Sequence, residues 1–194
     1  MSNPWDSDVR LLAEFAFAVP PPWLEPGQPL ASIGLLLRDF PPYPDTPPQA
    51  HPILSCGVDG IHWSAMTAGN SSGYVVVMTV PPSVGVNLVV GESLSEFLAL
   101  GCGSHFVGLA ALVEDITAEL GGESDIEEVA DVMAALRNRF SLSPWPNLPA
   151  RLAELEAQYG RPEGRVPRDR EAEAELIRRS EEFVEKMRRS LGDL

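Results

Sequence analysis

The chain has 194 residues, 44% of them hydrophobic, and its formal net charge at pH 7 is −14. This length supports one well-buried core, and no run of about eighteen apolar residues predicts a membrane-spanning helix. The acids are unevenly distributed, because residues 39–136 hold thirteen Asp and Glu and no Lys or Arg. Such a segment disfavours nucleic acids and anionic membranes as partners and favours a basic protein, although solubility alone would also explain it.

The first residues, MSNPWDSD, lack the basic and apolar regions of a signal peptide. A cytoplasmic protein is therefore expected. Cys56 and Cys102 are the only cysteines, too few for the disulfide framework of a small secreted domain. We expect both to be small buried thiols.

The first predicted element is a short helix over residues 8–19, with Ser7 as its N-cap and three prolines after its end. Residues 32–40 form an apolar run that fits either a strand or a helix. The prolines of residues 41–52 predict an extended or turn-like segment, because proline lacks an N–H and restricts the residue before it.

Three strands are predicted next, over residues 60–66, 74–80 and 85–90. The first alternates, and places Trp63 on its inward face. The second is β-branched and almost entirely apolar, which is typical of a central strand buried on both faces. The turn formers of residues 67–73 predict a hairpin, and the short connections favour an antiparallel meander.

Helices are predicted after the strands. Ser93 and Glu96 form a capping box for a short helix that Gly101 closes. Ser104 is expected to cap a second helix, over residues 105–120.

The last third of the chain also reads as helical. A capping box at residues 124–127 precedes a helix with an apolar stripe, and another helix is predicted over residues 149–159, with Pro149 at its start. The order of strands first and helices later is typical of an α+β domain, here assigned to residues 1–160. A basic linker, 161–170, and an amphipathic helix, 171–194, complete the chain; this helix is expected to pack on the domain or to form a homodimer.

Two histidines, one cysteine and one aspartate lie close together: His51, Cys56, Asp59 and His62. Their spacing is not a standard zinc pattern, so no metal and no cofactor is predicted. A nucleophilic Cys56 would need a nearby cation to lower its pKa, and within this segment only a histidine could serve. An enzyme built on Cys56 and His62 is therefore the least favoured reading.

The same stretch is better interpreted as a structural turn. Gly57 and Gly60 permit a positive φ, and Asp59 followed by Gly60 is a strong turn signal before a strand. The turn would fix the start of the strand that carries Trp63.

The order of these motifs resembles a known family. YPDTPP at Tyr43–Pro48 is followed by GVDGIHW at Gly57–Trp63, by the strand from Tyr74, and by the SLSEFL helix from Ser93. This order resembles bacterial members of the SUKH superfamily, which is named for a yeast regulator of cell-wall synthesis and for immunity proteins of polymorphic toxin systems. The resemblance covers about residues 30–100.

The resemblance implies an α+β fold with a central, mainly antiparallel sheet flanked by helices. It implies no enzyme activity, but a protein that binds and neutralises a toxin, often a nuclease. An acidic surface could occupy the basic site in which a nuclease holds phosphates. Trp63 could add an aromatic anchor if it is exposed. The expected contact residues are Asp39, Tyr43, Asp45, Asp59, Glu92 and Glu96. The alternative is a scaffold or regulatory module of the same fold without a toxin partner.

Overall fold

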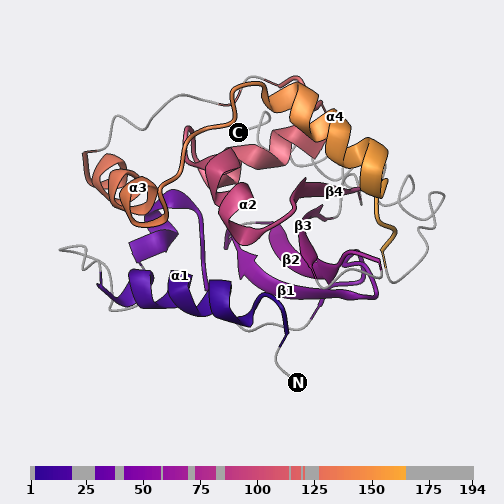
Figure 1. The fold of residues 1–194 in the computed structure, drawn as a ribbon, viewed down its shortest axis with the longest axis horizontal. Helices are drawn as coiled ribbons and strands as arrows, with labels where there is room; N and C mark the ends of the chain where they lie inside the picture. Colours follow the sequence, from indigo (N-terminus) through magenta and orange to yellow (C-terminus); the bar gives the residue numbers. More distant parts are fainter. Residues whose placement is uncertain are drawn as a thin grey trace, which may run out of the picture.

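The computed structural model describes residues 3–18, 29–37, 42–57, 59–69, 73–81, 86–113, 115–118, 120 and 127–164. In these residues the chain has the α+β fold expected, with a four-stranded antiparallel sheet and helices around it (Figure 1). Four predictions lie outside the described residues: the contact residue Asp39, the capping residues 124–126, the linker beyond residue 164, and the C-terminal helix.

The sheet has the strand order β1-β2-β3-β4. The strands are β1 (Ala50–Ser55), β2 (His62–Thr67), β3 (Tyr74–Val80) and β4 (Val86–Gly91). Each pairs antiparallel with its neighbour, which confirms the predicted meander. All seven residues of β3 are buried, as expected of a central strand.

Strand β1 was not predicted, because Pro52 lies inside it. A proline is tolerated here since β1 is an edge strand, where one missing N–H need not break a ladder on both sides. The pairing with β2 also shifts register between Pro52 and Leu54. The turn-like segment predicted for residues 41–52 is therefore correct for the loop before Ala50, but the prediction missed that the last residues of this segment begin β1.

The main core lies on one face of the sheet, under α2 (Leu94–Gly101) and η2 (Phe106–Val113). Trp63 is fully buried there, with its ring 5.2 Å from Phe97 and 6.4 Å from Phe106. Gly101 is the last residue of α2, close to the predicted end, but the C-cap is Cys102; a Cβ at Gly101 would lie 2.2 Å from the Phe106 ring. Only glycine lets α2 and η2 approach this closely.

The predicted helix over residues 105–120 is wrong in type and length. Residues 106–113 form a 3₁₀ helix instead. Phe106, Leu109 and Leu112 are all fully buried, and this three-residue repeat matches the three residues per turn of a 3₁₀ helix. The predicted cap is also wrong, because the buried Ser104 hydroxyl has no hydrogen-bond partner in the described part of the chain.

Helix α1 (Asp6–Ala18) begins before the predicted N-cap, so Ser7 lies inside its first turn. The Asp6 carboxylate accepts a hydrogen bond from the Asn3 backbone N–H at 2.7 Å. Two residues further, Asp8 accepts from the Tyr74 hydroxyl, which itself accepts from the Leu94 N–H. Tyr74 thus joins α1, β3 and α2.

For the apolar run at residues 32–40 the sequence left strand and helix open; its described part, residues 32–37, forms neither an α-helix nor a regular strand. It starts inside a short 3₁₀ helix, η1 (Pro29–Ile33), and continues to a single bridge between Leu36 and Ser55. Gly34, with a φ of 80°, lies between the two.

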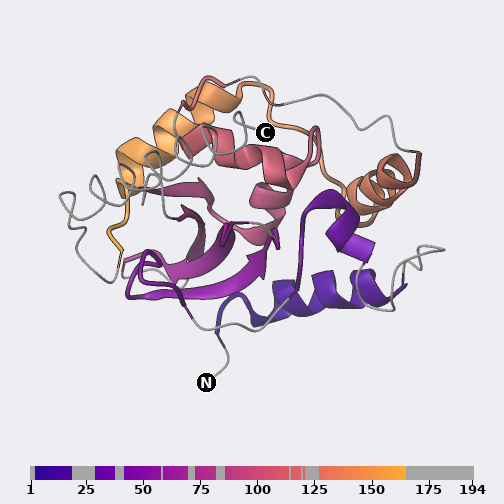
Figure 2. The same ribbon diagram turned by 180° about the vertical axis from the view of Figure 1, so that it is seen from behind.

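The remaining helices are α3 (Glu127–Phe140) and α4 (Leu148–Tyr159). The stripe predicted for α3 faces the core, with Met133 and Leu136 buried. Helix α4 begins at an Asn147 cap with Pro149 in its first turn, close to the prediction. Figures 1 and 2 place α1 along the β1 side of the sheet and α4 along the β4 side.

Helix α4 covers the second face of the sheet, where Leu155 packs with Val75, Val77 and Val89. Both cysteines are buried and not disulfide-bonded, as expected. No single helix in the described residues is long and apolar enough to cross a membrane; α2 and η2, bent by 102°, reach that length and composition only as a pair.

Candidate functional site

Three of the expected contact residues meet at one end of the sheet. Tyr43 is 41% exposed, and its ring lies 5.2 Å from the His62 ring. A Cβ on Gly60 would lie 3.9 Å from the same tyrosine ring, so Asp59 and Tyr43 belong to one surface. Asp45 is close enough to act on the charge of His62.

The turn before β2 has the backbone conformation that its sequence predicts. Gly57 and Gly60 have φ values of 78° and 71°, and Asp59 between them has a φ of 50°. Asp tolerates this left-handed region better than most residues. The Cys56 N–H donates to the Ile61 carbonyl across the turn at 3.1 Å, and the Asp59 side chain is left exposed.

His62 lies beneath this surface and is fully buried. Its Nδ1 lies 2.8 Å from the Gly60 carbonyl, so Nδ1 must carry the proton and donate it. Its Nε2 then accepts from the Thr46 hydroxyl, also at 2.8 Å. Burial lowers the pKa of His62, against the opposing effects of the Gly60 bond and of Asp45. A neutral His62 adds no positive charge to the acids above it.

Asn87 holds the proline loop to the sheet. Its side-chain oxygen accepts from the Thr79 hydroxyl at 2.6 Å. Its side-chain nitrogen donates to the Asp45 carbonyl at 3.0 Å and to the Pro162 carbonyl at 2.9 Å. The segment after α4 is therefore fixed beside the loop, and it adds the exposed Glu163.

Sequence reasoning missed Asn87 and Glu163. The available signal was a single amide inside the apolar strand GVNLVV, since a buried amide needs hydrogen-bond partners. Those partners lie 42 and 75 residues away. We call the exposed Tyr43, Asp59 and Glu163, together with the half-buried Asp45, the proline-loop surface.

Glu92 and Glu96 lie elsewhere. Asn87 is near the start of β4 and Glu92 directly follows its end, which separates the two groups by about 17 Å along the strand. Arg151 from α4 bonds to both carboxylates, at 2.6 Å to Glu92 and 2.8 Å to Glu96. These two acids therefore do not share the proline-loop surface.

Further hydrogen bonds hold this second group. The Tyr159 hydroxyl donates to Glu92 at 2.6 Å, and it is the main cause, ahead of Arg151, of the lowered pKa of Glu92. The capping box predicted for Ser93 and Glu96 forms only in part. Ser93 accepts from the Glu96 N–H as predicted, but the Glu96 carboxylate accepts from the Glu92 N–H rather than from that of Ser93.

The remaining predicted residues are placed as follows. Trp63 is fully buried, so it is not a surface anchor. Asp39 lies outside the described residues. His51 stacks on Trp5, with ring centroids 6.0 Å apart. In the residues that the structure describes, no group of three or more His, Cys, Asp or Glu is placed to hold a metal ion.

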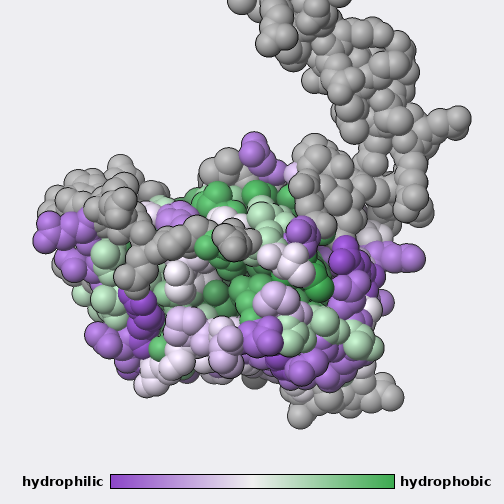
Figure 3. All heavy atoms as spheres, turned by 90° about the horizontal axis from the view of Figure 1, so that it is seen from above, coloured by the Kyte–Doolittle hydropathy of each residue, from purple (hydrophilic) through white to green (hydrophobic). Residues whose placement is uncertain are grey.

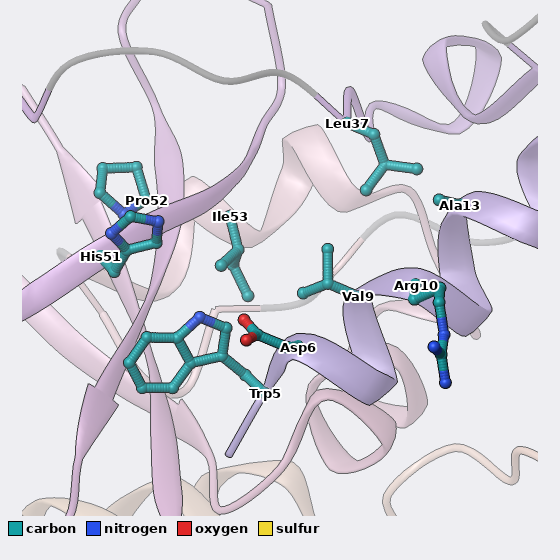
Figure 4. Close-up of a pocket in the computed structure, with 9 residues that line it drawn as sticks. All are labelled: Trp5, Asp6, Val9, Arg10, Ala13, Leu37, His51, Pro52 and Ile53. Atoms are coloured by element: carbon teal, nitrogen blue, oxygen red, sulfur yellow. The ribbon is translucent and has the colours of Figure 1, made fainter. Parts of the chain in front are cut away.

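Two further surfaces are largely apolar. A groove of about 610 Å³ lies between α1 and the edge strand β1 (Figure 4). Figure 3 shows a second apolar area in the middle of the upper face, between polar regions.

No family model matches the chain, and no curated protein or solved structure was found to be similar to it.

Proposed function

We propose that this protein is a non-enzymatic, immunity-type member of the SUKH superfamily that neutralises a basic, nuclease-like toxin domain. The proline-loop surface is the proposed binding face. The observation that carries the proposal is its charge: three exposed or half-buried acids lie at the same end of the sheet as Tyr43, and residues 39–136 supply no Lys or Arg to offset them. Arg161, the nearest described base in sequence to Glu163, pairs with Glu156 at 2.7 Å.

The surface combines two functions that a binding face needs. Acids speed the encounter with a basic partner and select against acidic ones. Affinity comes from a few buried anchors, and tyrosine is enriched among them. Tyr43 is held against His62 before any partner arrives, which lowers the entropy lost on binding.

The environment of His62 supports a non-enzymatic role. A Cys–His nucleophile requires a histidine nitrogen that can take the thiol proton. Here Nδ1 donates to Gly60 and Nε2 accepts from Thr46. Cys56 is buried as well. Burial in the core of the fold accounts for both residues without a catalytic role.

The test is co-expression with the toxin encoded beside this gene, followed by stopped-flow association of the purified pair. The triple variant Asp45→Asn, Asp59→Asn and Glu163→Gln should slow association by about ten-fold at low salt. A matched control, Glu14→Gln, Glu127→Gln and Asp131→Asn, removes the same charge from the exposed faces of α1 and α3. We expect it to change the rate less than about three-fold.

Two contrary outcomes are distinguishable. A toxin that stays lethal and forms no complex on a sizing column would reject the immunity function itself. A complex whose association is slowed equally by both triple variants would keep the function and reject the proline-loop surface.

The second candidate is a scaffold or regulatory module of the same fold. The groove between α1 and β1 favours it, because six of its nine lining residues are apolar and a largely apolar concave site offers protein binding that charge does not drive. Salt separates the two candidates. At 1 M salt the screening length is only about 3 Å, so binding through the acids would be lost while binding through the groove would persist.

A further inference from the structure

Glu92 is the point at which α4 is fixed to the end of β4. Its carboxylate accepts hydrogen bonds from three side chains of that helix: Arg151 at 2.6 Å, Gln158 at 3.1 Å and Tyr159 at 2.6 Å. The three donors extend over about two turns of α4. One carboxylate therefore fixes both the position of the helix along its axis and its rotation about that axis.

The apolar contact beneath α4 is small by comparison. The buried apolar residues of the helix are Leu152 and Leu155, and Leu155 packs on three valines of β3 and β4. Apolar contact holds α4 against the sheet, but it is non-directional and does not by itself determine where along the sheet the helix lies. The hydrogen bonds to Glu92 supply that direction.

The position of α4 determines the position of the segment that follows it, residues 160–164, which we call the strap. The Gly160 N–H donates to the Glu156 carbonyl at 2.8 Å, and Gly160 has a φ of 68°. The Arg161 guanidinium bonds to the Glu156 carboxylate at 2.7 Å and 3.3 Å. The strap therefore leaves α4 in one fixed direction, so a shift of the helix moves the strap as well.

The strap is in turn part of the proline-loop surface. The Pro162 carbonyl accepts from the Asn87 side chain, which also donates to the Asp45 carbonyl. A Cβ on Gly164 would lie 3.0 Å from the Asp45 Cα, so the backbones of strap and loop are in close contact. The exposed Glu163 lies between these two contacts in sequence. Its place beside Asp45 therefore depends on where α4 lies.

We propose that Glu92 is a positioning residue for the proline-loop surface. The sequence predicted Glu92 as a contact residue; in this arrangement it acts through α4 and the strap, and sets the place of Glu163 beside the loop. A strap released from the loop would have to be ordered again when a partner binds, which costs affinity. The effect on affinity rests on the proposed function, the binding of a basic toxin domain.

The first test measures hydrogen exchange by NMR in the full chain without a partner. Tyr159→Phe and Arg151→Met each remove a bond to Glu92, the first without a change of charge. The reporter is the side-chain amide of Asn87, which is 1% exposed and bonded to both the loop and the strap. The backbone amide of the fully buried Met78, in the central strand, reports global unfolding.

Both variants should accelerate exchange of the Asn87 side chain at least about three-fold more than exchange of the Met78 amide. A purely structural role of the bonds to Glu92 would accelerate the two by the same factor. Equal acceleration in both variants would therefore overturn the proposal.

The second test measures affinity for the purified toxin encoded beside this gene. Arg151→Met makes the chain one unit more negative, so electrostatic steering alone predicts equal or faster association with a basic partner. Loss of positioning predicts the opposite, an affinity lower by about five-fold. The matched control Arg139→Met removes the same charge from the exposed side of α3, and should change the affinity by less than about two-fold.

The outcomes separate this proposal from the proposed function. Unchanged toxin affinity in a variant whose Asn87 exchange is accelerated would overturn the positioning role and keep the proposed function. If the unaltered chain binds no toxin, the proposed function fails, and the ratio of Asn87 to Met78 exchange still decides whether Glu92 positions the strap.

Discussion

The two ends of β4 carry acids of the same kind in opposite electrostatic settings. At the start of the strand, Asn87 holds the loop that presents Asp45, and the histidine beneath is kept neutral by burial. Past its end, Glu92 and Glu96 are bridged by one guanidinium, that of Arg151. Asp45, Asn87, Glu92 and Glu96 all come from a segment without a Lys or Arg. Only the end at the start of β4 remains negatively charged.

The difference shows how charge along a sequence relates to charge on a surface. The cation that neutralises Glu92 lies 59 residues away, outside the cation-free segment. The net charge counted over residues 39–136 therefore overstates the negative field near Glu92, at the end of β4. The same count describes the proline-loop surface well. Substitutions at the two ends of β4 should show how each end contributes to stability and to the charge of the surface.

The largest effect is expected for Asn87→Ala. The change removes the acceptor of the Thr79 hydroxyl and the donor to Asp45 and Pro162, all at a site only 1% exposed. Leaving buried groups without partners should lower the free energy of unfolding by about 2 kcal/mol, measured by urea denaturation. Hydrogen exchange should also rise in residues 43–47.

The matched control for this variant is Asn138→Ala, on the exposed side of α3. It should change stability by less than about 0.5 kcal/mol. Equal effects of the two substitutions would mean that the amide of Asn87 does not hold the loop.

An intermediate effect is expected for Arg151→Met. The side chain is 27% exposed and bonds to Glu92, Glu96 and Glu154, so we expect a loss of about 1 kcal/mol, reduced by solvent screening. The pKa of Glu92, lowered by Tyr159 and then by Arg151, should rise toward its ordinary value. NMR titration of the Glu92 carboxylate measures this shift.

Arg161→Met provides the comparison, because Arg161 is more exposed and pairs with one carboxylate, that of Glu156. Arg161→Met should lower the free energy of unfolding clearly less than Arg151→Met does. If the two variants are equally stable, the bridge at the end of β4 contributes nothing beyond an ordinary surface pair.

The smallest effect is a pH dependence at the proline-loop end. The pKa of His62 is lowered in the folded state by burial, so below its unfolded value of about 6.5 the unfolded chain binds the proton more readily. The stability that depends on neutral His62 is present above that pH and decreases as the pH falls toward the folded value. Urea denaturation between pH 7.5 and 5.5 should show the decrease.

The slope of stability against pH should be smaller in a His62→Gln chain and retained in a His51→Gln chain. An unchanged slope without His62 would assign the dependence to another group. The comparison uses slopes, because the His62 substitution also removes two hydrogen bonds.

The elements that could be predicted are those whose signal is local. The all-apolar run of β3, the alternation that turns Trp63 inward, and the positive φ at Gly57 and Gly60 each follow from a few adjacent residues. Strand β1 was missed because a local rule against proline gives way at a sheet edge. The 3₁₀ winding of η2 was missed because its cause is contact with other elements, including the ring of Phe106 against Gly101.

In the candidate site, too, some residues could be placed from local sequence and others only from contacts distant in sequence. Tyr43 and Asp59 could be placed near one another from the order of loop, turn and strand. The grouping of Asp45 with Glu163 depends on Asn87, whose partners are far away in sequence. The removal of Glu92 and Glu96 from that surface depends on where α4 packs, which propensity and periodicity do not specify.

The hydroxyl of Tyr74 also bears on the order of folding. It receives the Leu94 N–H and donates to Asp8, a residue 66 positions earlier in the chain. During synthesis α1 leaves the ribosome long before either partner exists, and closing so long a loop is slow compared with forming a helix. Helix α1 should therefore dock late, after the hairpin of β2 and β3 and the start of α2 have formed, although its residues are made first.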